Sequence, residues 1–163
     1  MKKLIVFILL LFPVYFRAQS SVTFRITNMG STVEGQFERF KLNIQWNESN
    51  PAASTVSGIV YVESINTGIS LRDRHLRSSS YFHVSKFPEI TFKSKKIEKG
   101  REPGTYKIIG DLTIKDVTKE HIFVLSFTPG GGKEFTTTLN RREFNVGGWS
   151  LTMGDEVQVI VVE

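Results

Sequence analysis

Apolar and polar residues alternate along most of the chain after residue 20, which is the pattern of half-buried antiparallel strands. In the segment VTFRIT, for example, Val22, Phe24 and Ile26 fall on one face. The same alternation predicts eight strands, over residues 22–27, 33–40, 41–46, 55–65, 89–97, 106–114, 119–127 and 155–163. We therefore predict an all-β protein.

Turn residues separate these segments at roughly the 8–12-residue spacing of a β-sandwich or barrel. We find no repeat or linker, so residues 21–163 are predicted to form one domain. Some strands are apolar on both faces, as at Ile59/Val60 and Ile122/Phe123. One face would then fill a barrel interior, while the other packs beneath a helix or against a partner subunit. The many aromatic residues on strands favour a roomy interior, and an eight-stranded barrel can hold one small ligand.

One stretch, SLRDRHLRSSSYF at residues 70–82, departs from the strand pattern. Ser70 followed by Asp73 resembles a capping box, and Leu71, His75 and Phe82 recur at helical spacing. Asp73 and Arg77 are i,i+4 neighbours and are expected to pair. The stretch predicts a short helix near residues 70–80 that lies over one end of the barrel.

The first twenty residues are predicted to be a signal peptide that is cleaved, which implies an exported protein. Lys2 and Lys3 precede the apolar run LIVFILLLFPVYF, and small residues follow it. Cleavage is expected after Ser20, with Ala18 as the alternative. The run is shorter than the ~20 apolar residues of a membrane span, so no stable span is expected after cleavage.

Charge and cysteine content narrow the class further. The formal net charge is +5, but removing residues 1–20 lowers the basic count from 21 to 18 against 16 acids. The mature charge of about +2 argues against a nucleic-acid partner. The sequence has no cysteine, which excludes disulfides, thiolate metal sites and a cysteine nucleophile.

No segment has the spacing of a known catalytic or metal motif. The three histidines are scattered, and His121, on an apolar strand face, is expected to be a hydrogen-bonded core residue. Gly130–Gly132 is predicted to be a hairpin turn and not a phosphate loop. The charged group RRE at 141–143 is expected to be a solvated or strand-edge group and not a binding site. We therefore predict no metal site and no cofactor.

Several motifs, in order, resemble those of the YceI-like family of exported lipid (polyisoprenoid)-binding proteins. They extend over essentially the whole mature chain, and together they are more specific than any one alone. Asp116 stands where the family has glycine and is expected to adopt a left-handed conformation. The motifs are VEGQF at 33–37, NTG at 66–68, RDRHLRSSSYF at 72–82, FPEITF at 87–92, GDLTIKDVTK at 110–119 and NRREF at 140–144.

The resemblance implies a lipocalin-like, extended antiparallel β-barrel with a long apolar cavity. It implies non-enzymatic binding, carriage or storage of an isoprenoid-type lipid, polyisoprenoid or quinone-like, in the bacterial periplasm. Arg72 and His75 are the residues expected to meet a polar head group. For any single residue of the expected lining, a role in the ordinary hydrophobic core explains its position about as well as contact with a ligand. The expected lining is Phe37, Phe40, Val60, Val62, Leu76, Phe82, Phe92, Leu112, Ile114 and Leu125.

Two alternatives remain open at this stage. The first is an enzyme that acts on an envelope isoprenoid or other small molecule, with Asp73 and His75 as acid and base; both would have to face the cavity. The second is a homodimeric interaction protein in which the two-faced strands form the interface and any lipid is incidental.

Overall fold

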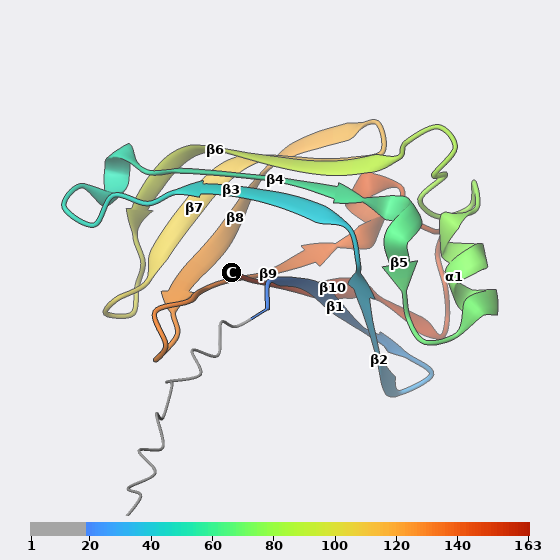
Figure 1. Cartoon of the computed structure of the whole chain (residues 1–163). Coiled ribbons are helices and arrows are strands. Elements are labelled where there is room, and N and C mark those ends of the chain that lie inside the picture. The colour runs from blue at the N-terminus through green and yellow to red at the C-terminus, as the bar shows by residue number, and fades with distance from the viewer. Residues whose placement is uncertain (1–18) are drawn as a thin grey trace, which may run out of the picture.

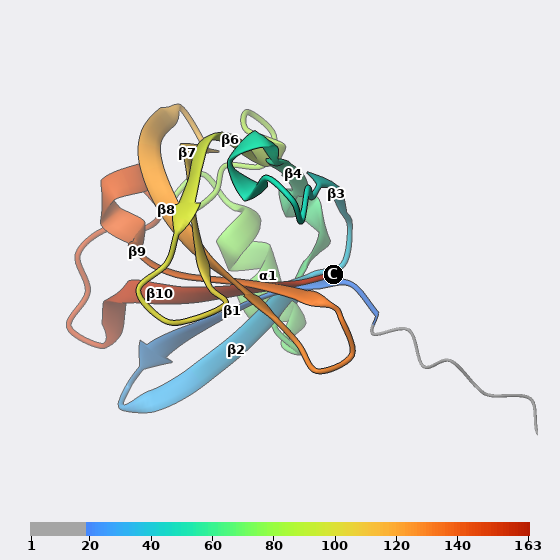
Figure 2. The same ribbon diagram turned by 90° about the vertical axis from the view of Figure 1, so that its left-hand side faces the viewer.

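The computed structural model describes residues 19–163, in which ten antiparallel strands curl into a half-barrel with one short α-helix at one end (Figures 1 and 2). The all-β prediction and the short helix are confirmed. The predicted signal peptide lies almost wholly outside the described residues. The strands are β1 (Ser21–Asn28), β2 (Ser31–Phe37), β3 (Phe40–Gln45), β4 (Thr55–Tyr61), β5 (Ile65–Asn66), β6 (Glu89–Lys99), β7 (Tyr106–Ile114), β8 (Val117–Phe127), β9 (Lys133–Asn140) and β10 (Met153–Val162), and the helix is α1 (Ser70–Arg77).

The strands form a single sheet in the order β3-β4-β6-β7-β8-β9-β10-β1-β2-β5. Its two terminal strands are continuations of strands already in it. β3 continues β2 across Glu38 and Arg39, and β5 continues β4 across a 3-10 turn. Backbone hydrogen bonds tie this corner, from Glu38 N to Ser64 O (3.1 Å) and from Tyr61 N to Arg39 O (3.0 Å). The ten strands therefore amount to eight strand lengths, two of them bent.

The alternation analysis missed β9 and counted the two halves of one bent strand, β2 and β3, separately. The sequence of β9, KEFTTTLN, contains three consecutive threonines that hide its apolar face. Threonine is nevertheless a good strand former because its branched side chain fits a pleated surface. The strand pairs with both β8 and β10, with Leu125 opposite Phe135 and Val157 opposite Leu139.

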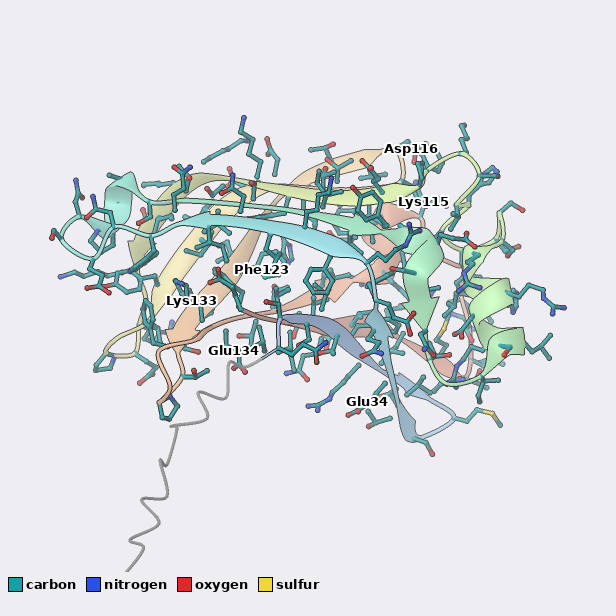
Figure 3. All side chains as sticks on the ribbon, viewed as in Figure 1. Glu34, Lys115, Asp116, Phe123, Lys133 and Glu134 are labelled. Carbon is teal, nitrogen blue, oxygen red and sulfur yellow. The ribbon has the colours of Figure 1, made fainter. Side chains whose placement is uncertain are left out.

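The turn between β7 and β8 differs from the expectation in one residue. Lys115, with φ of 58°, is the left-handed residue, and Asp116 is not. The two form the connection between Ile114 and Val117 at the end of the barrel that carries α1 (Figure 3). The Lys115 ammonium donates a hydrogen bond to the backbone oxygen of Asn145 (2.5 Å), so the conformation directs this side chain toward a neighbouring loop.

The helix begins without the predicted capping box. Ile69 is the N-cap residue and Ser70 is already helical. The Asp73 carboxylate instead accepts hydrogen bonds from Thr67, at its backbone N (2.9 Å) and its Oγ1 (2.5 Å). The predicted Asp73–Arg77 pair is also wrong, because Arg77 donates to backbone oxygens of the segment before the helix. The acid and the arginine both anchor α1 to that segment.

Buried apolar residues form three clusters along the interior of the half-barrel. Phe123 belongs to the cluster farthest from α1, and Figure 3 shows it pointing between the two halves of the sheet. Phe37, Val62 and Ile65 belong to the cluster beneath α1, and Phe144 to the one beneath the loop after β9. Between these clusters the interior is not filled.

Candidate functional site

Two cavities lie inside the half-barrel and share part of their walls. Their volumes are about 140 Å³ and about 120 Å³, whereas a single water molecule needs only ~10–15 Å³ on this scale. Because one set of side chains faces both, the two cavities adjoin along a shared apolar wall. The shared residues are Phe37, Ile90, Ile114, Leu139 and Val159.

The second cavity, farther from α1, is lined almost entirely by hydrocarbon. Ser57 and Gly58 are the exceptions among its lining residues. Every strand except the short β5 supplies the rest from inward positions, and Val56, Phe123 and Phe135 are also buried core residues. This half of the space offers nothing to a polar group and suits a hydrocarbon chain.

The first cavity lies beside α1 and collects the polar side chains of the site. They come from the tip of β1, the segments before and after α1, the helix itself and the loop after β9. Apolar atoms nevertheless form nearly all of the surface that faces this cavity, so it suits hydrocarbon as the second cavity does. We call it the polar end because polar residues are part of its lining. The polar residues in its lining are Asn28, Thr67, Arg72, Tyr81 and Arg141.

Seven of the ten residues predicted to line the cavity do so. Phe37 and Ile114 face both cavities, and Leu76 and Phe82 line the first cavity. The other three line the second cavity. Those three are Val60, Phe92 and Leu112.

The other three predicted lining residues lie outside the cavity wall. Val62 and Leu125 are almost fully buried in the clusters, and Phe40 is half-buried against one of them. Their contact with a ligand remains a prediction, and their positions outside both cavities do not support it.

The two predicted head-group residues have different positions. Arg72 lines the first cavity, and Thr67 fixes its guanidinium by accepting from Nε at Oγ1 (2.7 Å) and from Nη2 at its backbone oxygen (2.7 Å). Nη1 has no hydrogen-bond partner among the described residues. His75 is exposed, does not line either cavity and lies edge-on against the Tyr81 ring, with centroids 4.9 Å apart.

The candidate acid and base are also not brought together over the cavity. Asp73 is buried and bonded to Thr67, and it lies outside the lining of both parts. His75 is on the solvent side of the same helix. Their geometry therefore does not meet the requirement that acid–base groups reach a ligand's reacting atoms.

The RRE group at 141–143, expected to be solvated or at a strand edge, follows the end of β9, and its Arg141 is not solvated but only 3% exposed. Its guanidinium donates to the backbone oxygens of Val146, Gly148 and Gly154 and to the Asp155 carboxylate, at 2.8–3.0 Å. A charge run in sequence normally marks a solvated surface, but here one member closes the cavity end and holds the loop before β10.

His121 is, as expected, a hydrogen-bonded residue, with Nε2 2.8 Å from Thr137 Oγ1. The Thr137 hydroxyl donates to the Ile122 backbone oxygen (2.9 Å), so it accepts from His121. Burial lowers the pKa of His121, and the smaller effect of Glu143 opposes this. Within residues 19–163, no three His, Asp or Glu side chains are grouped so that they could hold a metal ion. No helix in this part of the chain is long and apolar enough to cross a membrane.

About three quarters of the cavity wall was not predicted from the sequence. Phe24, Ile26, Val157, Val159 and Val161 stand at inward positions that the alternation identifies, but they were not included in the predicted lining. Leu139 and Phe135 were missed with β9. The first group could have been found from the sequence by extending the lining to every inward residue of every strand.

The geometry can now be compared with known proteins. Residues 16–162 match the model of the YceI-like domain. The chain belongs to the YceI-like family. A curated member, the UPF0312 protein of Yersinia enterocolitica, is 31% identical over 150 residues, which cover 86% of this chain and 77% of that protein.

Several solved structures share the fold. Burkholderia cenocepacia BcnA is 23% identical with a TM-score of 0.81, covering 88% of this chain and 94% of BcnA. The Campylobacter jejuni YceI protein is 20% identical with a TM-score of 0.71, covering 99% and 96%. A domain from Saccharophagus degradans is 10% identical with a TM-score of 0.63, covering 88% and 91%; it is described as a polyisoprenoid-binding domain implicated in plant cell wall breakdown.

Proposed function

We propose that this YceI-like protein binds one isoprenoid-type lipid, polyisoprenoid or quinone-like, along the two adjoining cavities and carries or stores it without chemical conversion. The observation that carries the proposal is that two apolar cavities lie inside the half-barrel and adjoin along a wall of five shared side chains. A similar fold described as polyisoprenoid-binding in Saccharophagus degradans supports the ligand class.

The energetics favour a long hydrocarbon ligand. Each methylene group removed from water contributes ~0.8 kcal/mol, so a chain of several isoprene units could bind tightly with few polar contacts. Leu139, Ile90 and Val159 are interior side chains that remain half-exposed because they face the empty space. Filling that space would bury them.

Within this proposal the protein works outside the cytoplasm, after export directed by residues 1–20. The basic residues at 2–3, the apolar run and the small residues near 18–20 support export. Sequencing the N-terminus of the protein from fractionated cells tests it: a start at Gln19 or Ser21 in an exported fraction is expected, and an intact Met1 in the cytoplasm would overturn it.

The lipid itself is tested by extraction. Protein purified without detergent is extracted with organic solvent, and the extract is analysed by mass spectrometry. About one long-chain isoprenoid lipid per chain is expected. Protein that yields no lipid, and that does not take up an added polyprenyl lipid, would overturn the proposal.

Arg72 gives the ligand its orientation in this proposal. Thr67 holds its guanidinium at the polar end, so Nη1 is free to donate to a phosphate, carbonyl or hydroxyl oxygen. The Arg72→Gln variant is expected to weaken binding of an isoprenoid with an oxygen-bearing head group about tenfold, the size of a lost charge-assisted hydrogen bond. Binding of the corresponding hydrocarbon without a head group should change little.

A homodimer remains a separate proposal. Ile122 and Val124 are exposed on the outer face of β8, where a partner chain could cover them. Sedimentation at several protein concentrations tests this, and a monomer at all concentrations would exclude it.

A further inference from the structure

The most exposed large apolar side chains of the described residues gather at one end of the molecule. Their exposed fractions run from 53% to 85%, whereas the remaining exposed large apolar residues, on β8, reach at most 44%. Large apolar side chains gathered in this way usually mark an interaction surface. The five are Met29, Ile69, Leu71, Trp149 and Leu151.

These side chains come from three separate segments, residues 28–32, 67–72 and 146–153, which we call the rim. Each segment also contributes residues to the lining of the first cavity, among them Asn28, Thr67 and Met153. Figure 1 places the β1–β2 turn, α1 and the loop before β10 at the same end of the half-barrel. The rim therefore surrounds the polar end of the cavity.

Contacts between the segments hold the rim together. The Met29 backbone N donates to the backbone oxygen of Thr152 (2.8 Å), which joins the first segment to the third. A Cβ added to Gly147 would lie 2.8 Å from the Tyr81 ring, so the third segment packs closely against the chain that follows α1. The exposed apolar residues are therefore presented by a connected structure.

The conformation of the β1–β2 turn does not explain why a methionine stands at position 29. Met29 and Gly30 both have positive φ, 51° and 75°, in the two-residue turn between β1 and β2. This turn favours Asn-Gly, because asparagine adopts a left-handed conformation more readily than methionine. The chain thus carries an exposed apolar side chain where a polar one would stabilise the turn.

Charge distinguishes among the surfaces that the rim could meet. The three rim segments contain no Asp or Glu. Arg74 is exposed on the adjoining helix and has no hydrogen-bond partner among the described residues. The nearby β7–β8 turn adds one charge of each sign, Lys115 and Asp116 (Figure 3). An apolar surface with a basic neighbour and no acid is complementary to an anionic lipid surface.

We propose that the rim docks on the surface of an anionic phospholipid bilayer. Trp149 lies at the depth of the head groups, which suits the indole ring, and Leu71 and Leu151 reach the boundary of the acyl chains. Arg74 remains among the lipid phosphates. Docking brings the polar end of the cavity to the bilayer, and it depends on the rim and not on what the cavity contains.

The test measures co-sedimentation with vesicles of phosphatidylcholine and phosphatidylglycerol. The chain used begins at Gln19, because all ten strands and all three core clusters lie within residues 19–163. The rim variant is Met29→Asn with Leu151→Ser, and the matched control is Ile122→Ser with Val124→Ser, which removes two exposed apolar residues from β8. Met29→Asn suits its turn, so the rim variant is expected to stay folded.

We expect the wild-type chain and the control to bind these vesicles alike, and the rim variant to bind at least tenfold more weakly with an unchanged melting temperature. Arg74→Ala should weaken binding about fivefold, and only on vesicles that contain phosphatidylglycerol. Equal binding by the rim and control variants, no binding by the wild-type chain, or equal binding to vesicles of phosphatidylcholine alone would overturn the proposal.

A dimer that forms through the rim, with no vesicle binding, would also overturn it in favour of a second copy of the chain. Fluorescence adds an independent readout, because lipids brominated near the head group should quench Trp149. Trp46 is the internal reference, since it packs against Tyr106 and Phe127. Vesicle binding is scored without reference to bound lipid, so its failure would leave the proposed cavity ligand standing.

Discussion

Asp73 lies in a stretch whose residues resemble an active site, but its carboxylate has a structural role. It is 7% exposed, and its Oδ1 accepts two hydrogen bonds from Thr67. The same Thr67 holds Arg72 toward the cavity. Asp73 therefore acts on the site through the loop that positions Arg72.

The first prediction concerns this carboxylate. Asp73→Ala leaves the Thr67 backbone N and hydroxyl, which are partly buried, without their acceptor. Unsatisfied groups of this kind cost about 1–3 kcal/mol. We expect the free energy of unfolding in urea to fall by that amount, and to fall less for Asp73→Asn, which keeps one acceptor oxygen. Glu63→Ala is the control; its carboxylate is exposed and 3.8 Å from Arg77, so a change below about 0.5 kcal/mol is expected. Equal effects of the two alanine variants would contradict this assignment.

The second prediction concerns His121 and pH. Burial lowers its pKa below 6.5 in the folded protein, so the unfolded chain binds a proton more readily than the folded one. The free energy of unfolding should therefore fall as the pH drops from 6.5 toward the lowered pKa of His121. NMR titration of the imidazole should show the lowered pKa directly.

The His121→Gln variant isolates this contribution from those of other titrating groups. Glutamine can still donate a hydrogen bond to Thr137 but does not titrate. Between about pH 7.5 and about pH 5.5 the variant should lose less stability than the wild-type protein. An equal loss in both proteins would show that the histidine is not responsible.

At the scale of elements, the close approach of β6 and β7 depends on Gly110. β6 has an irregularity between Ser94 and Lys96, and Gly110 faces Ser94 there. A Cβ at Gly110 would lie 2.3 Å from the backbone oxygen of Lys93. A backbone oxygen within a ladder cannot move aside as a flexible side chain can.

The third prediction follows from this contact. Gly110→Ala should force the two strands apart and lower the free energy of unfolding by about 1–3 kcal/mol. Gly154→Ala, in β10, is the matched control because its nearest atom, the backbone oxygen of Thr27, would be 3.4 Å away. Urea denaturation of both variants measures the difference, and similar stabilities would show that the strand spacing at Gly110 can relax.

The alternation of apolar and polar residues predicts some of the strands well and others poorly. It located strands such as β1, β7 and β8 because each has one buried face, and burial on one face imposes a period of two. It failed for β9, whose threonines are compatible with either face. It also could not show that β2 and β3 are one bent strand, since the bend depends on pairing with β4 and β5.

At the scale of the whole molecule, the cavity depends on strands far apart in the sequence. Val159 is one of the five residues that face both parts. It pairs with Phe24 of β1 on one side and Thr137 of β9 on the other. A larger side chain there would divide the space.

The fourth prediction tests whether the cavity is used along its length. Val159→Trp should keep the fold, at a cost of about 1–3 kcal/mol for overpacking, and should recover less than half of the wild-type amount of long-chain lipid on extraction. Val124→Trp, on the outer face of β8, is the control and should retain the full amount. A full load of the same chain length in Val159→Trp would contradict a continuous binding space.

The fold class, the family, the short helix and part of the inward-facing wall could be predicted from the amino-acid sequence alone. Each of these depends on local periodicity or on motifs read in order. The sequence also predicted that Arg72 would lie near a ligand's polar end, and Arg72 does line the cavity.

Which inward residues face empty space and which are core depends on how the strands pack in three dimensions. Val62 and Leu125 have the same alternation as Val60 and Phe123, yet they pack against neighbours and not against the cavity. Packing depends on the side chains that adjacent strands bring opposite, and sequence spacing does not encode that. The burial of Arg141 and the gathering of the rim from three segments have the same origin, because both depend on loops that meet only when the sheet curls.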